Sequence, residues 1–335
     1  MVNYLPWHKE AFEALWARRE RLPHALLLYG ARGMGKAAFA EAIAQRLLCE
    51  ATGGGGTCGA CPSCTWFANG SHPDFARLEP AVEAGDEEQG TSATKKNTQI
   101  VVEQVRGLSD FLGVSTHRGG WRIVLVNPAE NLNVNAANAL LKNLEEPPPR
   151  TLFVLVSHRL QQVLPTIKSR CELLPLPSPS SEEATRWLGS QGVEEAHLVA
   201  AYTGGAPLAG LAPPVDGYWE RRRQFLRHLT SARIDPLAAA EDCEDAGVRL
   251  MLEWLQKWTY DVADRKMSGA VRYNVDHDEP IGRIAAACDP LRMLRFHREL
   301  VRMQRHADHP LNGRLVAEQL FMAYAEAASP RRTAP

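Results

Sequence analysis

A glycine-rich segment near the start of the chain has the spacing of a phosphate-binding loop. The segment GARGMGKA matches the pattern G-x-x-x-x-G-K, and its glycine and lysine positions are Gly30, Gly33, Gly35 and Lys36. In such a loop the backbone N–H groups surround the phosphates, and the lysine reaches the β- and γ-oxygens. The next position normally carries Ser or Thr, whose hydroxyl binds Mg²⁺. Because Ala37 stands there, the segment predicts a phosphate loop without its metal-binding hydroxyl.

A second metal-binding position is also missing from the sequence pattern. Nucleotide sites of this kind hold Mg²⁺ with an acidic residue near the end of a neighbouring strand. The candidate strand, RIVLVNPAEN, ends in Asn127 and Pro128, which carry no charge, and Glu130 is expected beyond the strand end. We therefore predict a degenerate loop that hydrolyses nothing, while nucleotide binding without hydrolysis stays open. A chance glycine cluster and a working ATPase with substitute groups are the alternatives.

Four cysteines follow the expected first helix of this loop. They are Cys49, Cys58, Cys61 and Cys64, the last three with two-residue spacers. Four thiolates are the ligands of a tetrahedral structural zinc, and such a site leaves no open position for a catalytic water. We predict structural zinc. The alternatives are an iron–sulfur cluster, whose usual cysteine order differs, and inert buried thiols. His72 is near enough in sequence to replace one ligand, but HPD at 72–74 is more typical of a turn.

Arg170 has two interpretations. The segment LPTIKSRCELLPL contains Ser169, Arg170 and Cys171 just before the expected end of the sheet. An arginine at a domain edge is most often simply solvated. Beside a phosphate-loop fold, however, it is also a candidate arginine finger, because oligomeric ATPases place one subunit's arginine in the next subunit's pocket to stabilise transition-state charge.

The elements that position these residues follow from apolar runs and helical spacing. Three short apolar runs predict buried strands at 24–30, 121–127 and 151–157. Helices are expected after the loop, where Phe39, Ile43 and Leu47 share one face, and at 135–149, where prolines end the pattern. Alternating strands and helices predict an α/β P-loop domain with a parallel sheet.

The rest of the chain is expected to be helical. Strand signals stop after about residue 176, and Ser180 with Glu183 has the spacing of a helix capping box. We expect an α/β domain over 1–176 with a zinc module at 49–64, a small helical domain over 177–213 and an all-α domain over 214–330. The charged stretch 83–98 is expected to form a surface loop, and no role is assigned to it.

The overall composition is that of an ordinary globular protein. The 335 residues are 45% hydrophobic and 23% charged, and the formal net charge is −1. This balance argues against a protein that coats nucleic acid. No secretory signal or membrane-spanning run is evident, so we expect a cytoplasmic protein without membrane contacts. The seven cysteines are then expected to be thiols or metal ligands.

Together these segments resemble the clamp-loader branch of the AAA+ family over nearly the whole chain. The matching segments are HALLLYGARGMGK, the four-cysteine insertion, HPD, NAANALLKNLEEPP, SRC and LNGRLVAEQLF. The resemblance implies a pentameric ring that opens a sliding clamp and places it on primed DNA for the replicative polymerase. It also implies that 1–176 is an AAA+ nucleotide-binding-like domain, 177–213 a helical lid and 214–330 a collar that joins the ring.

Departures from the family pattern indicate which member of the ring this chain resembles. Motor subunits of this branch carry an intact hydroxyl after the loop lysine, an acidic pair after the second strand, and an arginine at a lid helix. Here Ala37 and Asn127 stand at the first two, and TGGAPLAG at 203–210 lacks the arginine. The polar first-sensor residue, Ser157, is retained. The resemblance therefore implies a nonhydrolysing subunit whose Arg170 reaches a neighbouring motor subunit, gamma or tau, in a ring that also contains delta.

Two rival functions remain at this point. The first is a catalytically active clamp-loader ATPase of the motor type, against which the missing groups argue. The second is a zinc-dependent nucleic-acid binder with a vestigial α/β domain. Residues 49–75 contain no Lys or Arg, whereas a DNA-binding module needs cations for the phosphates. The cysteine segment is thus expected to be structural or to contact protein.

Overall fold

The computed structural model describes residues 4–51, 56–81, 99–117, 119–211, 215–231, 233–304 and 312–330. The chain divides between Pro179 and Ser180 into two compact units, and each is described by itself. The predicted surface loop at 83–98 and residues 52–55 of the cysteine segment lie outside the described residues.

A five-stranded parallel sheet forms the centre of the N-terminal unit. Its strands are β1 (Ala25–Tyr29), β2 (Phe75–Leu78), β3 (Arg122–Val126), β4 (Thr151–Ser157) and β5 (Glu172–Pro175). The strand order is β2-β3-β4-β1-β5. Ala25 of β1 pairs with Phe153 of β4, while Leu26 pairs with Glu172 of β5. Since all strands are parallel, the phosphate-loop segment after β1 lies at the same edge as the ends of β3 and β4.

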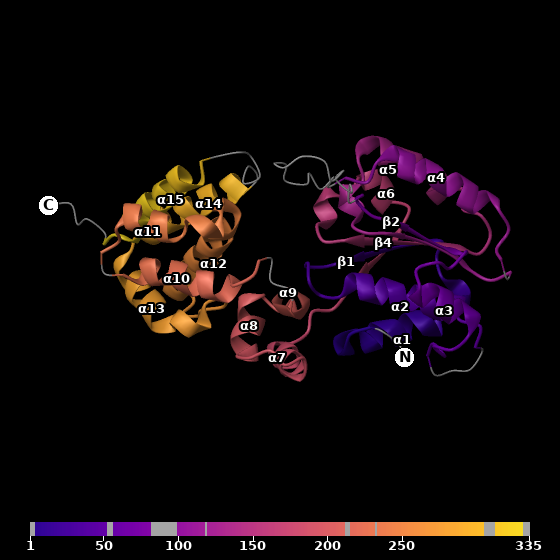
Figure 1. The fold of residues 1–335 in the computed structure, drawn as a ribbon, viewed down its shortest axis with the longest axis horizontal. Coiled ribbons are helices and arrows are strands. Elements are labelled where there is room, and N and C mark those ends of the chain that lie inside the picture. Colours follow the sequence, from indigo (N-terminus) through magenta and orange to yellow (C-terminus); the bar gives the residue numbers. More distant parts are fainter. Residues whose placement is uncertain are drawn as a thin grey trace, which may run out of the picture. The chain divides into compact units, whose positions relative to one another are not determined.

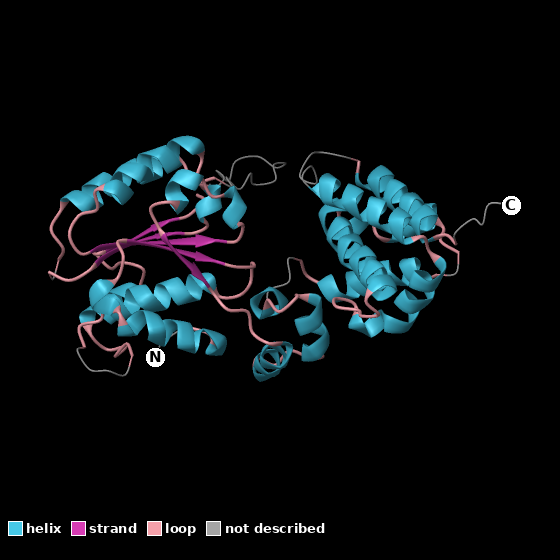
Figure 2. Cartoon of the chain, turned by 180° about the vertical axis from the view of Figure 1, so that it is seen from behind, coloured by secondary structure: helices cyan, strands magenta, loops and turns pink. Residues whose placement is uncertain are grey.

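Helices cover both faces of this sheet (Figures 1 and 2). One face carries α1 (Lys9–Ala17), α2 (Lys36–Leu48) and α3 (Pro62–Ala68), and the other carries α4 (Val102–Gly113), α5 (Val134–Glu145) and α6 (Pro165–Lys168). Short 3₁₀ segments are η1 (Pro6–His8), η2 (Arg19–Arg21), η3 (Ala129–Asn131) and η4 (Leu160–Gln162). The central strands are buried along their whole length, as expected for parallel strands packed on both sides. The predicted α/β P-loop fold class is confirmed.

The C-terminal unit contains helices and no strand among its described residues. Its elements are α7 (Ser181–Ser190), α8 (Ala196–Tyr202), α9 (Pro207–Leu211), α10 (Tyr218–Thr230), α11 (Pro236–Asp242), η5 (Glu244–Ala246), α12 (Val248–Met267), η6 (Val275–His277), α13 (Asp278–Ala287), α14 (Pro290–Met303) and α15 (Gly313–Ala328). The predicted capping box is present, because Ser180 Oγ accepts from Glu183 N at 3.1 Å and Glu183 Oε2 accepts from Ser180 N at 2.8 Å.

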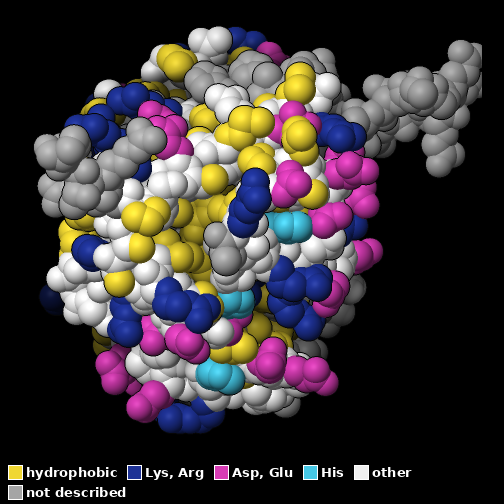
Figure 3. All heavy atoms as spheres, turned by 90° about the vertical axis from the view of Figure 1, so that its left-hand side faces the viewer, with side chains coloured by type: hydrophobic (Ala, Val, Ile, Leu, Met, Phe, Trp, Pro, Cys, Tyr) yellow, Lys and Arg dark blue, Asp and Glu magenta, His cyan; other side chains and the backbone are white. Residues whose placement is uncertain are grey.

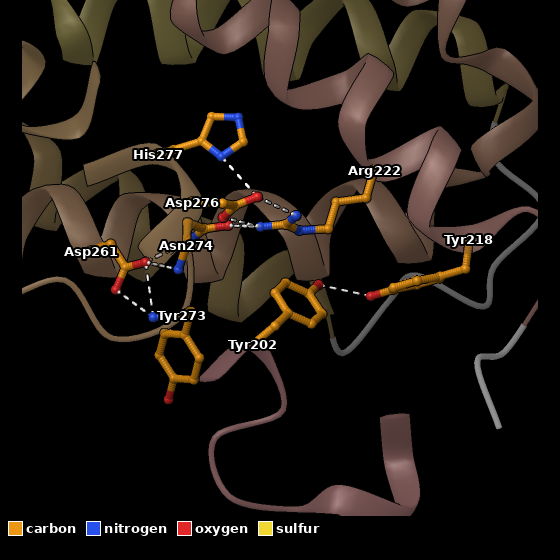
Figure 4. A network of polar contacts seen from close by, with 8 residues as sticks. All are labelled: Tyr202, Tyr218, Arg222, Asp261, Tyr273, Asn274, Asp276 and His277. Atoms are coloured by element: carbon orange, nitrogen blue, oxygen red, sulfur yellow. Dashed lines mark hydrogen bonds and ion pairs between the residues drawn. The ribbon is translucent and has the colours of Figure 1, made fainter. Parts of the chain in front are cut away.

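A buried polar network organises the turn between α12 and α13 (Figure 4). The Asp261 carboxylate accepts the backbone N–H groups of Tyr273 and Asn274, the latter at 2.7 Å. Asn274 Oδ1 in turn accepts from Arg222 Nη2 at 2.7 Å, and the same guanidinium pairs with Asp276 at 3.1 Å. These bonds partner charges that would otherwise be costly to bury, and they join α10 to the segment just before α13.

Positive and negative side chains are mixed on the face shown in Figure 3, where Lys and Arg are interspersed with Asp and Glu and with apolar side chains.

Helices in the described part of the chain are all too short or too polar to cross a bilayer. The predicted lid at 177–213 corresponds to α7, α8 and α9, while residues 212–214 lie outside the described part; the division into lid and collar stays a prediction.

Candidate functional sites

The phosphate-loop segment connects β1 to α2 and depends on glycine at its tightest point. Gly35 has φ of +90°, a conformation that residues with a side chain rarely adopt. A Cβ added there would lie 2.2 Å from Leu5 Cδ1. Gly35 is therefore required by the backbone turn, and a Cβ there would also displace the end of the Leu5 side chain.

Lys36 is bound by its own loop. Its Nζ donates to the backbone carbonyls of Gly30 at 2.9 Å and Ala31 at 2.5 Å, and the residue is 2% exposed. Burial lowers the pKa of Lys36 to about 8, an effect that the nearby Glu130 carboxylate opposes. The amine that would reach a phosphate thus already has two acceptors within the loop.

The N-terminal segment packs directly on this loop. Trp7 Nε1 donates to the Met34 carbonyl at 3.2 Å, and the His8 ring lies edge-on to Phe39 with centroids 5.4 Å apart. Among the described residues, neither ring nitrogen of the fully buried His8 has a hydrogen-bond partner. Burial, reinforced by the charge of Lys36, lowers the pKa of His8 to about 4.

The neighbouring strand ends contribute contacts that the sequence did not indicate. Glu130 lies in η3, beyond the end of β3 as expected, but its Oε1 accepts from the backbone N–H of His158 at 2.9 Å and its charge acts on Lys36. The Glu130 carboxylate therefore acts on the loop lysine from beyond the strand end, while Asn127 and Pro128 at the strand end carry no charge. Burial and Lys36 lower the pKa of His158 to about 4. Ser157 Oγ accepts from Arg159 N at 3.2 Å.

The four predicted metal-ligating cysteines are brought together. The sulfur atoms of Cys49, Cys58, Cys61 and Cys64 all lie within 4.8 Å of one another. The Cys49–Cys58 and Cys58–Cys64 sulfur distances are 3.6 and 4.0 Å. Tetrahedral zinc with Zn–S bonds of about 2.3 Å places its sulfurs about 3.8 Å apart. The donor set and its spacing thus fit one tetrahedral metal ion.

Backbone amides favour the thiolate form at Cys58, whereas burial raises the pKa of Cys64 to about 12. The N–H groups of Cys58, Cys61 and Cys64 point to the sulfurs of Cys49, Cys58 and Cys61 at 3.4, 3.3 and 3.4 Å. Hydrogen bonds from the Ala60 and Cys61 backbones lower the pKa of Cys58 to about 6. A thiolate is the form that binds metal.

His72 lies outside this group of sulfur atoms. Its Nδ1 accepts from Asp74 N at 3.0 Å, and the Asp74 carboxylate accepts from His117 N at 2.9 Å. The HPD segment therefore forms a turn joined to the loop before β3, as its composition indicates.

Arg170 follows α6 and makes none of the contacts described above for the phosphate-loop segment. Its guanidinium donates to the Thr166 carbonyl at 3.0 Å, to Ser169 Oγ at 3.3 Å and to the Glu145 carboxylate. The side chain is 33% exposed, so part of it faces solvent. It neither packs into the core nor contacts Lys36.

Comparisons with known proteins identify the family. The model described as DNA polymerase III, delta subunit matches residues 8–180, and its C-terminal counterpart matches 216–324. The DNA polymerase III subunit delta' of Pseudomonas aeruginosa is 36% identical over 83% of this chain and 80% of its own length. The chain belongs to the DNA polymerase III delta' family. The Escherichia coli delta' subunit is 34% identical over 87% of this chain and 86% of its own.

A tau subunit is similar over a smaller part. The DNA polymerase III subunit tau of Salmonella typhimurium is 34% identical over 45% of this chain and 21% of its own length. The likeness to delta' subunits thus extends through the C-terminal unit, whereas the likeness to tau covers less than half of the chain. The resemblance drawn from the sequence motifs is confirmed at the level of the family.

Proposed function

We propose that this chain is a nonhydrolysing clamp-loader subunit that completes a neighbouring motor subunit's ATP site with Arg170. The observation that carries the first part is the state of Lys36, whose ammonium is buried and bound to the carbonyls of its own loop. Ala37 offers no hydroxyl to Mg²⁺, and the N-terminal segment packs on the loop at Gly35. These features favour a loop kept for its shape.

The proposed partners follow from the same role. The chain joins motor subunits, gamma or tau, and a delta subunit in a cytoplasmic ring that places a sliding clamp on primed DNA. The segment 177–213 is its lid and 214–330 its collar. The cysteine cluster holds structural zinc, a proposal supported by four sulfurs at tetrahedral spacing.

An ATPase of the motor type is the second candidate, and one observation favours it. The Glu130 carboxylate opposes the lowering of the Lys36 pKa by burial, and an acidic group near the loop lysine is one part of a metal-dependent site. Against it stand Ala37 and the lack of charge on Asn127 at the end of β3.

ATP turnover by the reconstituted loader, with DNA and clamp present, tests the proposal. Removing an arginine finger lowers turnover at its site by roughly 10³–10⁵ in well-studied NTPases. We expect Arg170→Ala to lower bulk turnover only in part, because the other motor sites stay intact, and Lys36→Ala to leave it unchanged. Lys168→Ala removes a nearby cation from α6 and serves as the matched control.

The outcomes separate the two candidates. Unchanged turnover with Arg170→Ala removes the finger assignment. A loss with Lys36→Ala shows instead that this chain's own loop binds or hydrolyses nucleotide.

A further inference from the structure

The end of α5 places an acidic side chain beside Arg170. Glu145 is the last residue of α5, and it follows Leu144, which is buried in the core that α5 shares with the sheet. Pro147 and the prolines after it prevent the helix from continuing. The backbone that carries Glu145 is therefore fixed by packing on one side and by proline on the other.

The three acceptors of Arg170 come from two different elements. Thr166 and Ser169 belong to the turn that carries Arg170 itself, and both accept from Nη1. The Glu145 carboxylate accepts from Nη2 and is 25 residues away in sequence. Glu145 thus supplies the hydrogen bond that ties the guanidinium to the body of the domain.

These bonds leave donors for another acceptor. A guanidinium has five N–H groups in a rigid plane, and the bonds to Thr166, Ser169 and Glu145 use three of them. The Nε–H and one Nη2 hydrogen have no partner among the described residues. Free donors in a plane that is already oriented suit a phosphate group, which guanidinium binds through two parallel N–H···O bonds.

We infer that Glu145 is a positioning residue for Arg170, holding the guanidinium plane so that its remaining N–H groups can reach a nucleotide phosphate on a neighbouring subunit. The inference rests on the proposed function of Arg170. The opposite role of the same contact would be restraint, because a carboxylate also competes with phosphate for an arginine. The two roles predict opposite changes in turnover when the carboxylate is removed.

The experiment is ATP turnover by the complete loader assembled with variants of this chain. The Arg170-dependent share is the difference between the unaltered chain and Arg170→Ala. We expect Glu145→Ala to lose most of this share through kcat, with the KM for ATP unchanged, because the contact acts in the transition state. Glu145→Gln keeps an oxygen acceptor without the charge, and we expect it to keep most of the share.

Two controls distinguish positioning from a structural effect. Glu146 is exposed, and its side chain has no hydrogen-bond or ion-pair partner among the described residues, so we expect Glu146→Ala to leave turnover unchanged. In the Arg170→Ala background, Glu145→Ala should cause no further loss, because Glu145 acts through Arg170. Should Glu145→Ala fail to fold, Glu145→Asp keeps the charge but shortens the reach, and we expect the same loss.

Each result decides the inference. Unchanged or raised turnover with Glu145→Ala overturns it, and so does an equal loss with Glu145→Gln. If Arg170→Ala itself has no effect, the inference falls together with the proposed function. A loss with Arg170→Ala and none with Glu145→Ala leaves the proposed function standing alone.

Discussion

Lys36 shows how one buried side chain can keep its place without a ligand. A buried ammonium needs acceptors, and the Gly30 and Ala31 carbonyls provide two. The remaining cost of burial appears as a pKa lowered to about 8. Any phosphate that entered the loop would have to draw the amine away from these carbonyls, so part of its binding energy would be spent on that exchange.

The buried His8 makes stability depend on pH. Its pKa is about 4 in the folded chain and about 6.5 when unfolded, so the unfolded state binds more protons between these values. The free energy of unfolding therefore falls as the pH drops from about 6.5 towards 4. We expect His8→Phe to remove about 2 kcal/mol of the fall between pH 7 and pH 5, measured by urea unfolding of the full chain.

The phenylalanine ring also changes stability in a way that does not depend on pH. Taking the difference in the free energy of unfolding between pH 7 and pH 5 for each variant removes that contribution. His197 on α8 is exposed, and His197→Phe is the control that should leave the fall unchanged. The pKa of His158 is also lowered, so His158 still contributes its part of the pH-dependent fall in the free energy of unfolding when His8 is replaced. A fall of the same size in His8→Phe and the unaltered chain would contradict the assignment.

The sequence predicts the site residues that belong to local patterns. Two motifs can be recognised because their residues recur at fixed sequence spacings. These are the phosphate-loop glycines with Lys36 and the four cysteines. His8, Glu130 and His158 were missed in their roles, and Glu145 was not linked to Arg170. Their contacts join segments far apart in the chain. A histidine directly after an apolar strand, as at His158, is a weak signal that the sequence did offer.

At the scale of elements, short edge strands escaped prediction while long central ones did not. The apolar runs of β3 and β4 are buried throughout and are evident in the sequence. β2 and β5 contain four residues each, too few for periodicity to distinguish a strand from a loop. Helices α12 and α14 lie in the part of the chain that the sequence predicts to be helical.

The cysteine segment is expected to need its metal for stability. We predict one zinc per chain, since four sulfurs have the spacing of a single tetrahedral ion. Structural zinc contributes apparent binding free energies of about 10–16 kcal/mol in small domains, so Cys64→Ser or a strong chelator should lower the thermal midpoint of the N-terminal unit. Elemental analysis and thermal unfolding check the two statements.

A substitution outside the cluster gives the matched comparison. Cys171 packs against the core of α5 and α6, and Cys171→Ser should keep one zinc per chain. Iron with visible absorbance would favour a cluster cofactor instead. A chain without bound metal would favour inert thiols.

At the scale of the molecule, the first helices of the C-terminal unit are joined to the rest of that unit by aromatic side chains, among them Tyr202 and Trp219. Tyr202 ends α8, and its ring lies 3.7 Å from Lys257 Nζ and 4.6 Å from the Arg222 guanidinium carbon. Its hydroxyl bonds to that of Tyr218 at 2.8 Å. The proposed lid is thus held to the proposed collar by a ring between two cations.

Tyr202 substitutions separate the ring from the hydroxyl. Cation–π contacts contribute about 0.5–2 kcal/mol each, and a neutral hydrogen bond about 1 kcal/mol. We expect Tyr202→Phe to lower the free energy of unfolding by about 1 kcal/mol and Tyr202→Leu by about 2–4 kcal/mol, in urea unfolding of the full chain.

Hydrogen exchange provides an independent measurement. Tyr202→Leu should speed exchange of backbone amides in 181–211 more than Tyr202→Phe does, because the ring makes the contacts that close this joint. Equal effects of the two substitutions would show instead that the Tyr202 hydroxyl, and not its ring, holds these helices to the rest of the unit.

The strand order also constrains how the chain folds during synthesis. β1 pairs with β4 and β5, so the first strand to leave the ribosome has no partner until Phe153 and its neighbours follow. At about 5–20 residues per second, that interval is on the order of ten seconds. During this time an apolar strand, ALLLY, is made but unpaired. The nascent chain therefore exposes this apolar strand well before the sheet can close.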